Sequence, residues 1–372
     1  MARFLFDAHH LGHQQTGNEM WARNVGARLA AHLPGHELTV ATTERGVDEV
    51  AIWGTSSPPL IVNGSSARRL AVDLPRAIRR SSYDAVMMQY TLPVWPCRSV
   101  VMIHDVSAAE PGAQAWLPTR TRTRYRTSFW TSAKVATYLL TVSEFTRRRI
   151  VELYGVAPDR VRVAPNAVDP EFARRLSAGS GHGRAQRQDA RWTILAVGNV
   201  LPRKNLLVAA DAVGRLVQGG LNARLRIVGT VPGQGRDIAA AMERSLGDRV
   251  TFSGYVTADQ LVEEYRSADT VVVPSFYEGF GIPVLEAMTA RIPVVTSDSS
   301  ALPEVGGGAA LVAPVADVGA WVEHLATIAH DESLRDDLVT RGSAHAARFD
   351  WGESARVTAA TLIDAGGNAE AA

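Results

Sequence analysis

The stretch PSFYEGFGIPVLE, Pro274–Glu286, decides the fold class of this chain. It follows an apolar, β-branched run that begins at Thr270 and predicts a buried strand. Pro283 then predicts the start of a helix, because the first turn of a helix does not use the amide N–H that proline lacks. A strand, a glycine-containing loop and a helix in this order are typical of parallel sheets in α/β proteins.

Two carboxylates and two glycines give the same stretch a candidate binding function. Glu278 lies in the loop and Glu286 in the expected first turn of the helix, with Gly279-Phe280-Gly281 between them. Glycine lets the backbone approach a ligand, and helix-start amides favour an anion such as phosphate. Carboxylates accept hydrogen bonds from sugar hydroxyls, so the pattern suits a ligand with both a phosphate and a polyol. Spacing alone leaves open that Glu286 only complements the helix dipole and that Glu278 is solvated.

The same alternation of apolar runs and helical patterns extends over the whole chain, which predicts two doubly wound parallel sheets. Ligands of such sheets bind beyond the carboxyl ends of the strands, where the glycine-rich turns of this chain fall, and two sheets suggest a cleft between domains. The expected strands are Arg3–Phe6, Leu38–Ala41, Ala85–Gln89, Val100–His104, Leu139–Val142, Val161–Val163, Thr193–Val197, Arg224–Val228, Val250–Phe252, Thr270–Pro274 and Ile292–Thr296.

The length of 372 residues favours two domains. Residues Phe172–Arg191 are rich in Gly, Ser, Arg and Gln and show no apolar period, which is typical of a linker or exposed loop. We therefore expect a first domain at 1–170, a linker at 171–190 and a second domain at 191–348.

Composition excludes several classes of protein. The formal net charge is +1, so no global field favours nucleic acid. Cys97 is the one cysteine, which excludes an intrachain disulfide and a cysteine-based zinc site. Neither a secretory leader nor an apolar run of about 18 residues is present in the sequence, so we expect a cytoplasmic protein.

A second candidate cluster lies in the turn after the expected strand Thr193–Val197. This turn, GNVLPRKN, begins at Gly198 and carries Arg203 and Lys204 just ahead of a helix. Two cations at this position suit a diphosphate. The chain has only two lysines among its 39 basic residues, which draws attention to Lys204. A solvated loop with Asn205 as a helix cap remains the alternative.

Two further segments lie after expected strands of the first half. His104 ends the strand Val100–His104, where an active-site role competes with a purely structural one. The loop Gly12–Gly17 could enclose a phosphate or an acceptor. The histidines in and just before this loop have no carboxylate or thiol at the spacing of metal ligands, so we expect no metal site.

Basic residues are patterned in the first half of the chain. Arg120 and Arg124 share one face of an expected helix, and Arg122 and Arg126 share another. An anionic membrane surface or an acidic acceptor could dock on these faces, so peripheral contact with the inner face of a membrane stays open. A solvated helix face is the alternative.

Taken together, these segments resemble the retaining glycosyltransferases of the GT-B fold, family 4, in the mannosyltransferase-like bacterial subgroup. The segments that carry the resemblance are DAHHLGHQQTGNE from Asp7, VMIHDVS from Val101, LLTVSEFTRRRIVELYGVAPDRVRVAPNAVD from Leu139, GNVLPRKNL from Gly198, PSFYEGFGIPVLEAM from Pro274 and PVVTSDSSALPEVGG from Pro293. The resemblance implies two Rossmann-like domains facing a cleft. The first would bind the acceptor, the second the nucleotide sugar, and the last helix, 351–366, would cross back onto the first domain.

The resemblance also implies roles for individual residues. In the second domain, Glu286 would bind the ribose hydroxyls and Glu278 the donor sugar. The other donor-binding positions there are Gly198, Arg203, Lys204, Gly279, Phe280 and Gly281, with Arg203 and Lys204 neutralising the leaving diphosphate. Gly17 would lie by the phosphates or the acceptor, and His104 near the reacting carbon. Neither a metal nor a cofactor is implied, and Glu278 is not expected to be a covalent nucleophile.

The implied activity is that of a hexosyltransferase. It would move a sugar from a nucleoside-diphosphate sugar to a hydroxyl of a glycan, a lipid-linked or a small natural-product acceptor, with retention of anomeric configuration. GDP-mannose is a subgroup-level expectation for the donor. A sugar-nucleotide epimerase of GT-B architecture and a non-catalytic nucleotide-sugar-binding protein are the alternatives. Thr16-Gly17-Asn18-Glu19 departs from the T-G-I-G often found in relatives, which puts the acceptor contacts in doubt.

Overall fold

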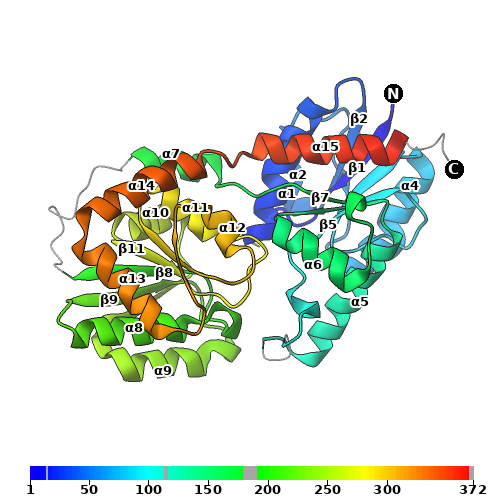
Figure 1. Ribbon diagram of the computed structural model, residues 1–372. Coiled ribbons are helices and arrows are strands. Elements are labelled where there is room, and N and C mark those ends of the chain that lie inside the picture. Colours follow the sequence, from blue (N-terminus) through cyan, green and yellow to red (C-terminus); the bar gives the residue numbers. More distant parts are fainter. Residues whose placement is uncertain (14–15, 113–115, 179–190, 368–372) are drawn as a thin grey trace. The chain divides into compact units, whose positions relative to one another are not determined.

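The computed structural model describes residues 1–13, 16–112, 116–178 and 191–367. The chain forms two compact units: Met1–Asn166 with Asp350–Ala372, and Ala167–Phe349. Each unit has its own parallel sheet with helices packed on it (Figure 1), which confirms the predicted α/β class. Both sheets are doubly wound, since their strand orders reverse direction in the middle.

The first unit is built on a seven-stranded sheet of order β3-β2-β1-β4-β5-β6-β7. Its strands are β1 (Arg3–Asp7), β2 (Glu37–Thr42), β3 (Leu60–Ile61), β4 (Ala85–Gln89), β5 (Ser99–Met102), β6 (Tyr138–Thr141) and β7 (Val161–Val163). Its α-helices are α1 (Thr16–Leu29), α2 (Val47–Ala51), α3 (Ser66–Arg68), α4 (Leu74–Ser81), α5 (Thr119–Val135), α6 (Glu144–Tyr154) and α15 (Trp351–Gly367). The sheet reverses its order between β1 and β4.

Helix α15 belongs to the first unit although the second unit precedes it in the chain. It packs against α1 and reaches β4 and β5. Its buried side combines small residues such as Ala355, Ala359 and Ala365 with Trp351 and Leu362. A hydrogen bond also joins α15 to the rest of the first unit: Arg98 Nη1 donates to the carbonyl of Gly366 at 2.7 Å.

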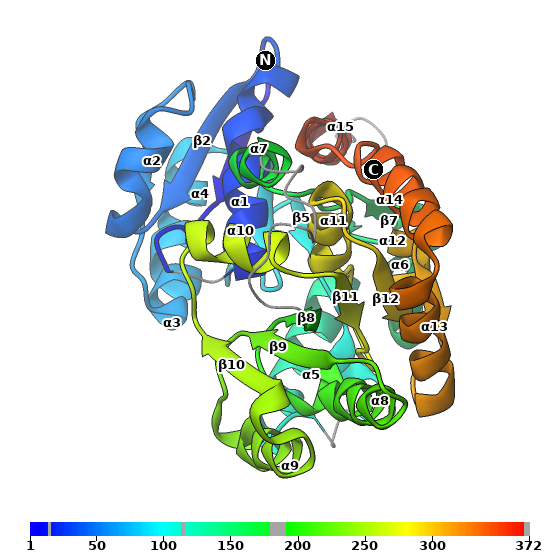
Figure 2. The same ribbon diagram turned by 90° about the vertical axis from the view of Figure 1, so that its left-hand side faces the viewer.

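The second unit is built on a six-stranded sheet of order β10-β9-β8-β11-β12-β13. Its strands are β8 (Trp192–Val197), β9 (Ala223–Val228), β10 (Val250–Gly254), β11 (Thr270–Val273), β12 (Val294–Ser297) and β13 (Leu311–Ala313). Its helices are α7 (Pro170–Ala178), α8 (Leu206–Gln218), α9 (Arg236–Leu246), α10 (Ala258–Arg266), α11 (Ile282–Thr289), α12 (Leu302–Gly306), α13 (Val318–His330) and α14 (Glu332–Ala346). Helix α8 packs against both α9 and α13, whereas α11 packs against α7 and α14, and α10 packs against α7 (Figure 2).

Helix α7 occupies residues that the sequence predicted as part of a linker. Phe172 and Leu176 are four residues apart and both buried, so this short helix has an apolar side after all. Two such residues in a basic stretch are too few to give a visible period. The rest of the expected linker, 179–190, lies outside the described residues.

Candidate functional site

The principal cluster lies at the switch point of the second sheet, where β8 and β11 are neighbours. The turn after β8 carries Arg203 and Lys204, and the loop after β11 carries Glu278. The amide of Phe276 donates to the carbonyl of Arg203 at 2.8 Å and joins the two loops. Parallel pairing of β8 with β11 therefore brings together side chains that are 74 residues apart.

Glu278 binds both cations of this cluster. Lys204 Nζ lies 2.6 Å from Glu278 Oε1, and Arg203 Nη1 lies 3.1 Å from Oε2. Ser275 Oγ also donates to Oε1 at 2.7 Å, and the Glu278 amide donates to Ser300 Oγ at 2.9 Å. The carboxylate is thus fixed through both oxygens and through its own backbone.

The electrostatics of this cluster keep Glu278 ionised. Burial raises the pKa of Glu278, but the positive charges of Lys204 and Arg203 outweigh it and hold the pKa at about 2. Two cations and one anion leave a net charge of +1 at the carboxyl edge of the sheet. Such an edge is suited to a diphosphate.

Gly198, the first residue of the turn after β8, is required by the local geometry. Its φ is +136°, a region that side chains other than that of glycine rarely adopt. A Cβ at this position would also lie 3.2 Å from Cε and Nζ of Lys204. The glycine therefore leaves room for the ammonium group that binds Glu278.

Glu286 lies in a separate, buried position on α11. The sequence predicted Glu286 in the first turn of this helix. The helix starts at Ile282, so Glu286 lies in the second turn instead. The helix dipole acts mainly on the first turn, which weakens the reading of Glu286 as a dipole partner. Its Oε2 accepts a 2.6 Å hydrogen bond from the hydroxyl of Tyr265. Burial raises the pKa of Glu286 to about 7, the Tyr265 bond opposes this rise, and the charge of Asp169 adds to it.

The segment between the two glutamates is largely buried. Phe280 is buried and contacts Phe349 edge-on, with ring centroids 5.7 Å apart. Gly281 has φ +116°, and a Cβ there would lie 2.8 Å from Cδ2 of Leu302. Gly279 precedes these two residues in the same loop.

In the first unit, His104 lies just beyond β5 and is buried. Its Nε2 lies 3.1 Å from Gln89 Oε1, and its ring meets Trp21 edge-on. Burial, together with the charge of His10, lowers the pKa of His104 to about 3. The imidazole is therefore neutral at physiological pH.

Gly17 lies in the first turn of α1, whereas the sequence placed it in a loop. A Cβ there would meet nothing within 4 Å, so neither space nor a positive φ requires glycine. Gln14 and Gln15, in the middle of the same predicted loop, lie outside the described residues. Among the described residues, no three or more His, Cys, Asp or Glu side chains gather in a way that could hold a metal ion.

Helix α5 carries the basic pattern seen in the sequence. Arg120, Arg124 and Arg126 are exposed, and Trp130, one turn beyond Arg126, keeps 55% of its surface exposed. An open cavity of about 400 Å³ adjoins this helix and is lined by Ala109, Thr123, Arg126, Thr127, Trp130, Leu153 and Tyr154. Within the described ranges, none of the helices is both long and apolar enough to span a bilayer.

Sequence reasoning missed three polar partners in the second unit. Ser275 and Ser300 orient Glu278, and Tyr265 binds Glu286. Ser275 lies within the quoted stretch, three residues before Glu278, so its proximity in sequence is the one local signal. Tyr265 comes from a different helix, so no local spacing points to it.

Comparison with known families and proteins extends these observations. The family described as "Glycosyltransferase Family 4" matches residues 16–172, and "Glycosyl transferases group 1" matches residues 182–345. The chain is 34% identical to "O-antigen chain mannosyltransferase B" of Escherichia coli over 68% of its own length and 67% of that protein. It is 32% identical to a "D-inositol 3-phosphate glycosyltransferase" of Kineococcus radiotolerans. This match covers 60% of this chain and 56% of the length of that relative.

Solved structures share the fold at low sequence identity. A sucrose-phosphate synthase from Thermosynechococcus elongatus superposes with a TM-score of 0.72 at 18% identity, covering 96% of this chain and 97% of that one. A glycosyltransferase from Rickettsia africae gives 0.71 at 13% identity, covering 98% of each chain. These likenesses concern the fold alone.

Proposed function

The chain belongs to glycosyltransferase family 4 and has the GT-B fold, and from this premise we propose that it transfers a hexose from GDP-mannose or a closely related nucleotide sugar. The acceptor is a hydroxyl of a glycan, of a lipid-linked or of a small-molecule substrate, and anomeric configuration is retained. One observation carries the proposal: Lys204, Arg203 and Glu278 meet at the switch point of the second sheet.

In this proposal, Arg203 and Lys204 stabilise the diphosphate leaving group. Glu278 holds Lys204 and Arg203 at the carboxyl edge of the sheet, where both cations would face the diphosphate of a bound donor. Charge that develops on the departing diphosphate then meets cations already in place, with no need to reorganise solvent. Backbone amides from Gly279 to Gly281 supply further donors at the start of α11.

Glu278 would bind the hydroxyls of the donor sugar and not attack its carbon. Both carboxylate oxygens already accept hydrogen bonds from strong donors. Its pKa of about 2 marks a carboxylate whose negative charge is strongly stabilised, which makes it a weak nucleophile. Glu286 would accept hydrogen bonds from the ribose hydroxyls.

The proposal for GDP-mannose rests on the mannosyltransferase relative from Escherichia coli. The decisive experiment incubates the chain with GDP-mannose, UDP-glucose and dTDP-sugars, each with and without a panel of acceptors. Release of GDP that depends on both GDP-mannose and an acceptor is the expected result. Formation of an epimer without acceptor would overturn the proposal in favour of the epimerase alternative.

For the acceptor, we propose a lipid-linked glycan met at an anionic membrane surface. Exposed arginines on α5 can contact lipid phosphates, and the exposed indole of Trp130 suits the interface between headgroups and acyl chains.

A further inference from the structure

A buried contact between helices α10 and α11 links Tyr265 to the glutamate proposed to bind ribose. Tyr265 is fully buried, and its hydroxyl donates to Glu286 Oε2 at 2.6 Å. This distance is in the short range of hydrogen bonds made to a charged acceptor. Glu286 is itself 6% exposed, so the bond is shielded from competing water.

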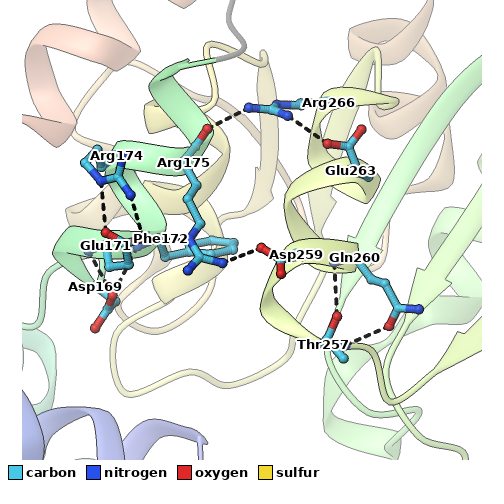
Figure 3. A network of polar contacts seen from close by, with 10 residues as sticks. All are labelled: Asp169, Glu171, Phe172, Arg174, Arg175, Thr257, Asp259, Gln260, Glu263 and Arg266. Carbon is cyan, nitrogen blue, oxygen red and sulfur yellow. Dashed lines mark hydrogen bonds and ion pairs between the residues drawn. The ribbon is translucent and has the colours of Figure 1, made fainter.

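Tyr265 is itself held in place by helix α7. The ring of Phe172 meets the Tyr265 ring edge-on, with centroids 6.2 Å apart. Figure 3 shows the polar contacts that fasten α7 to α10: Arg175 pairs with Asp259, and Arg266 Nη2 donates to the carbonyl of Arg175 at 2.8 Å. The exposed Arg175–Asp259 ion pair is weak alone, but together with the Arg266 hydrogen bond it keeps Phe172 against the tyrosine.

The start of α7 brings a second charge toward Glu286. Asp169 Oδ1 accepts from the amides of Glu171 and Phe172 at 3.0 and 3.1 Å, which anchors this carboxylate (Figure 3). Its negative charge favours the protonated form of Glu286, whereas the Tyr265 hydroxyl favours the ionised form. Among the described residues, these are the two ionisable groups that act on Glu286; α12 and α14, which also pack on α11, contribute none.

The hydrogen bond from Tyr265 gives the two oxygens of the Glu286 carboxylate different roles. Oε2 is occupied by the hydroxyl, and no donor among the described residues binds Oε1. A carboxylate held through one oxygen keeps a single orientation and presents the other oxygen to a ligand. Holding a binding group in advance saves the cost of ordering it when the ligand arrives.

We infer that Tyr265 is a positioning residue for nucleotide binding: it holds Glu286 by Oε2 so that Oε1 meets the ribose. The inference rests on the ribose-binding role proposed for Glu286. Tyr265 touches no substrate and acts only through the glutamate.

Calorimetric titration of the full chain with GDP and with UDP, from pH 6 to pH 8.5, tests the inference. Ribose hydroxyls bind the ionised carboxylate better, so the affinity of the unaltered chain rises with pH through about 7. Tyr265→Phe keeps the buried ring and removes one hydroxyl. We expect it to weaken binding at pH 7 by about tenfold, the scale of one hydrogen bond to a charged group, and to move the pH midpoint upward.

Asp169→Asn is the opposing variant, and it should move the pH midpoint downward and tighten binding at pH 6.5. Asparagine caps a helix as well as aspartate, so α7 should stay intact. A substitution that merely loosened the fold would not improve affinity. The matched control is Tyr154→Phe, which alters a buried tyrosine of the first unit whose hydroxyl has no hydrogen-bond partner among the described residues. The affinities of this variant should equal those of the unaltered chain.

The outcomes separate the inference from the function on which it rests. If Glu286→Ala leaves nucleotide affinity unchanged, the ribose role itself is wrong. If Glu286→Ala weakens binding but Tyr265→Phe changes neither affinity nor pH midpoint, the ribose role stands and the positioning role is overturned. A midpoint that moves in the same direction for Tyr265→Phe and Asp169→Asn would also overturn it.

Discussion

At the scale of single residues, the buried pair of Lys204 and Glu278 combines stability with chemistry. Their side chains are only 14% and 12% exposed. Removing either charge therefore leaves the other charge buried and unpaired. Breaking such a pair typically costs about 3–5 kcal/mol, whereas replacing both members by neutral side chains is often tolerated. Stability and turnover should therefore respond differently to single and double substitution.

We expect Lys204→Met to lower both the melting temperature and turnover. Adding Glu278→Gln should restore most of the melting temperature but not turnover, because the diphosphate still lacks its cation. A loss of roughly 100-fold or more in kcat is the scale expected for one transition-state contact. Thermal unfolding and steady-state kinetics of both variants check this, and near-normal turnover in either one would remove Lys204 from the site.

Glu286 should make the free protein less stable as pH rises. Its pKa in the folded chain is about 7 against an ordinary value of 4.5, so the folded state binds the proton more tightly than the unfolded state. This contribution is fully present below pH 4.5 and is lost as pH rises through 7. Glu286→Gln should therefore raise the melting temperature at pH 8 by a few degrees and have little effect at pH 5. Equal effects at both pH values would contradict the raised pKa.

At the scale of elements, the turn between β8 and α8 depends on its first residue. Gly198→Ala would force a Cβ against Lys204 in a backbone region that alanine avoids. We expect a clear loss of turnover with a modest loss of stability. Gly214→Ala is the control, because Gly214 lies within α8 with only a 3.7 Å neighbour for a Cβ, and alanine should stabilise the helix by about 0.5–1 kcal/mol. Equal kinetics for both variants would show that the turn tolerates the methyl group.

Helix α5 should govern contact with anionic lipid. Replacing Arg120, Arg124 and Arg126 by glutamate should abolish sedimentation with vesicles that contain phosphatidylglycerol, and binding by the unaltered chain should weaken with salt. Arg244→Glu on α9, also exposed, is the matched control and should keep binding. If neither the unaltered chain nor the control binds such vesicles, the proposed membrane contact is wrong, while the sugar-transfer proposal is unaffected.

At the scale of the whole molecule, α15 ties the end of the chain to the first unit. Truncation before Asp350 would expose the faces of α1, β4 and β5 that α15 covers. We expect the truncated chain to lose the cooperative unfolding of the first unit while GDP still stabilises the second. Differential scanning calorimetry with and without GDP checks this, and an unchanged thermogram would contradict the assignment of α15 to the first core.

By itself, the sequence predicted the two parallel sheets and the strand, loop and helix that carry Glu278. These features depend on local periodicity and on glycines that the turns require, and both can be read from neighbouring residues. Only the tertiary structure decided that Ser275 and Ser300 hold Glu278, that Phe172 makes α7 a packed helix, and that Tyr265 binds Glu286. The physical reason is that each of these depends on side chains brought together by the packing of separate elements, and such contacts have no period along the chain.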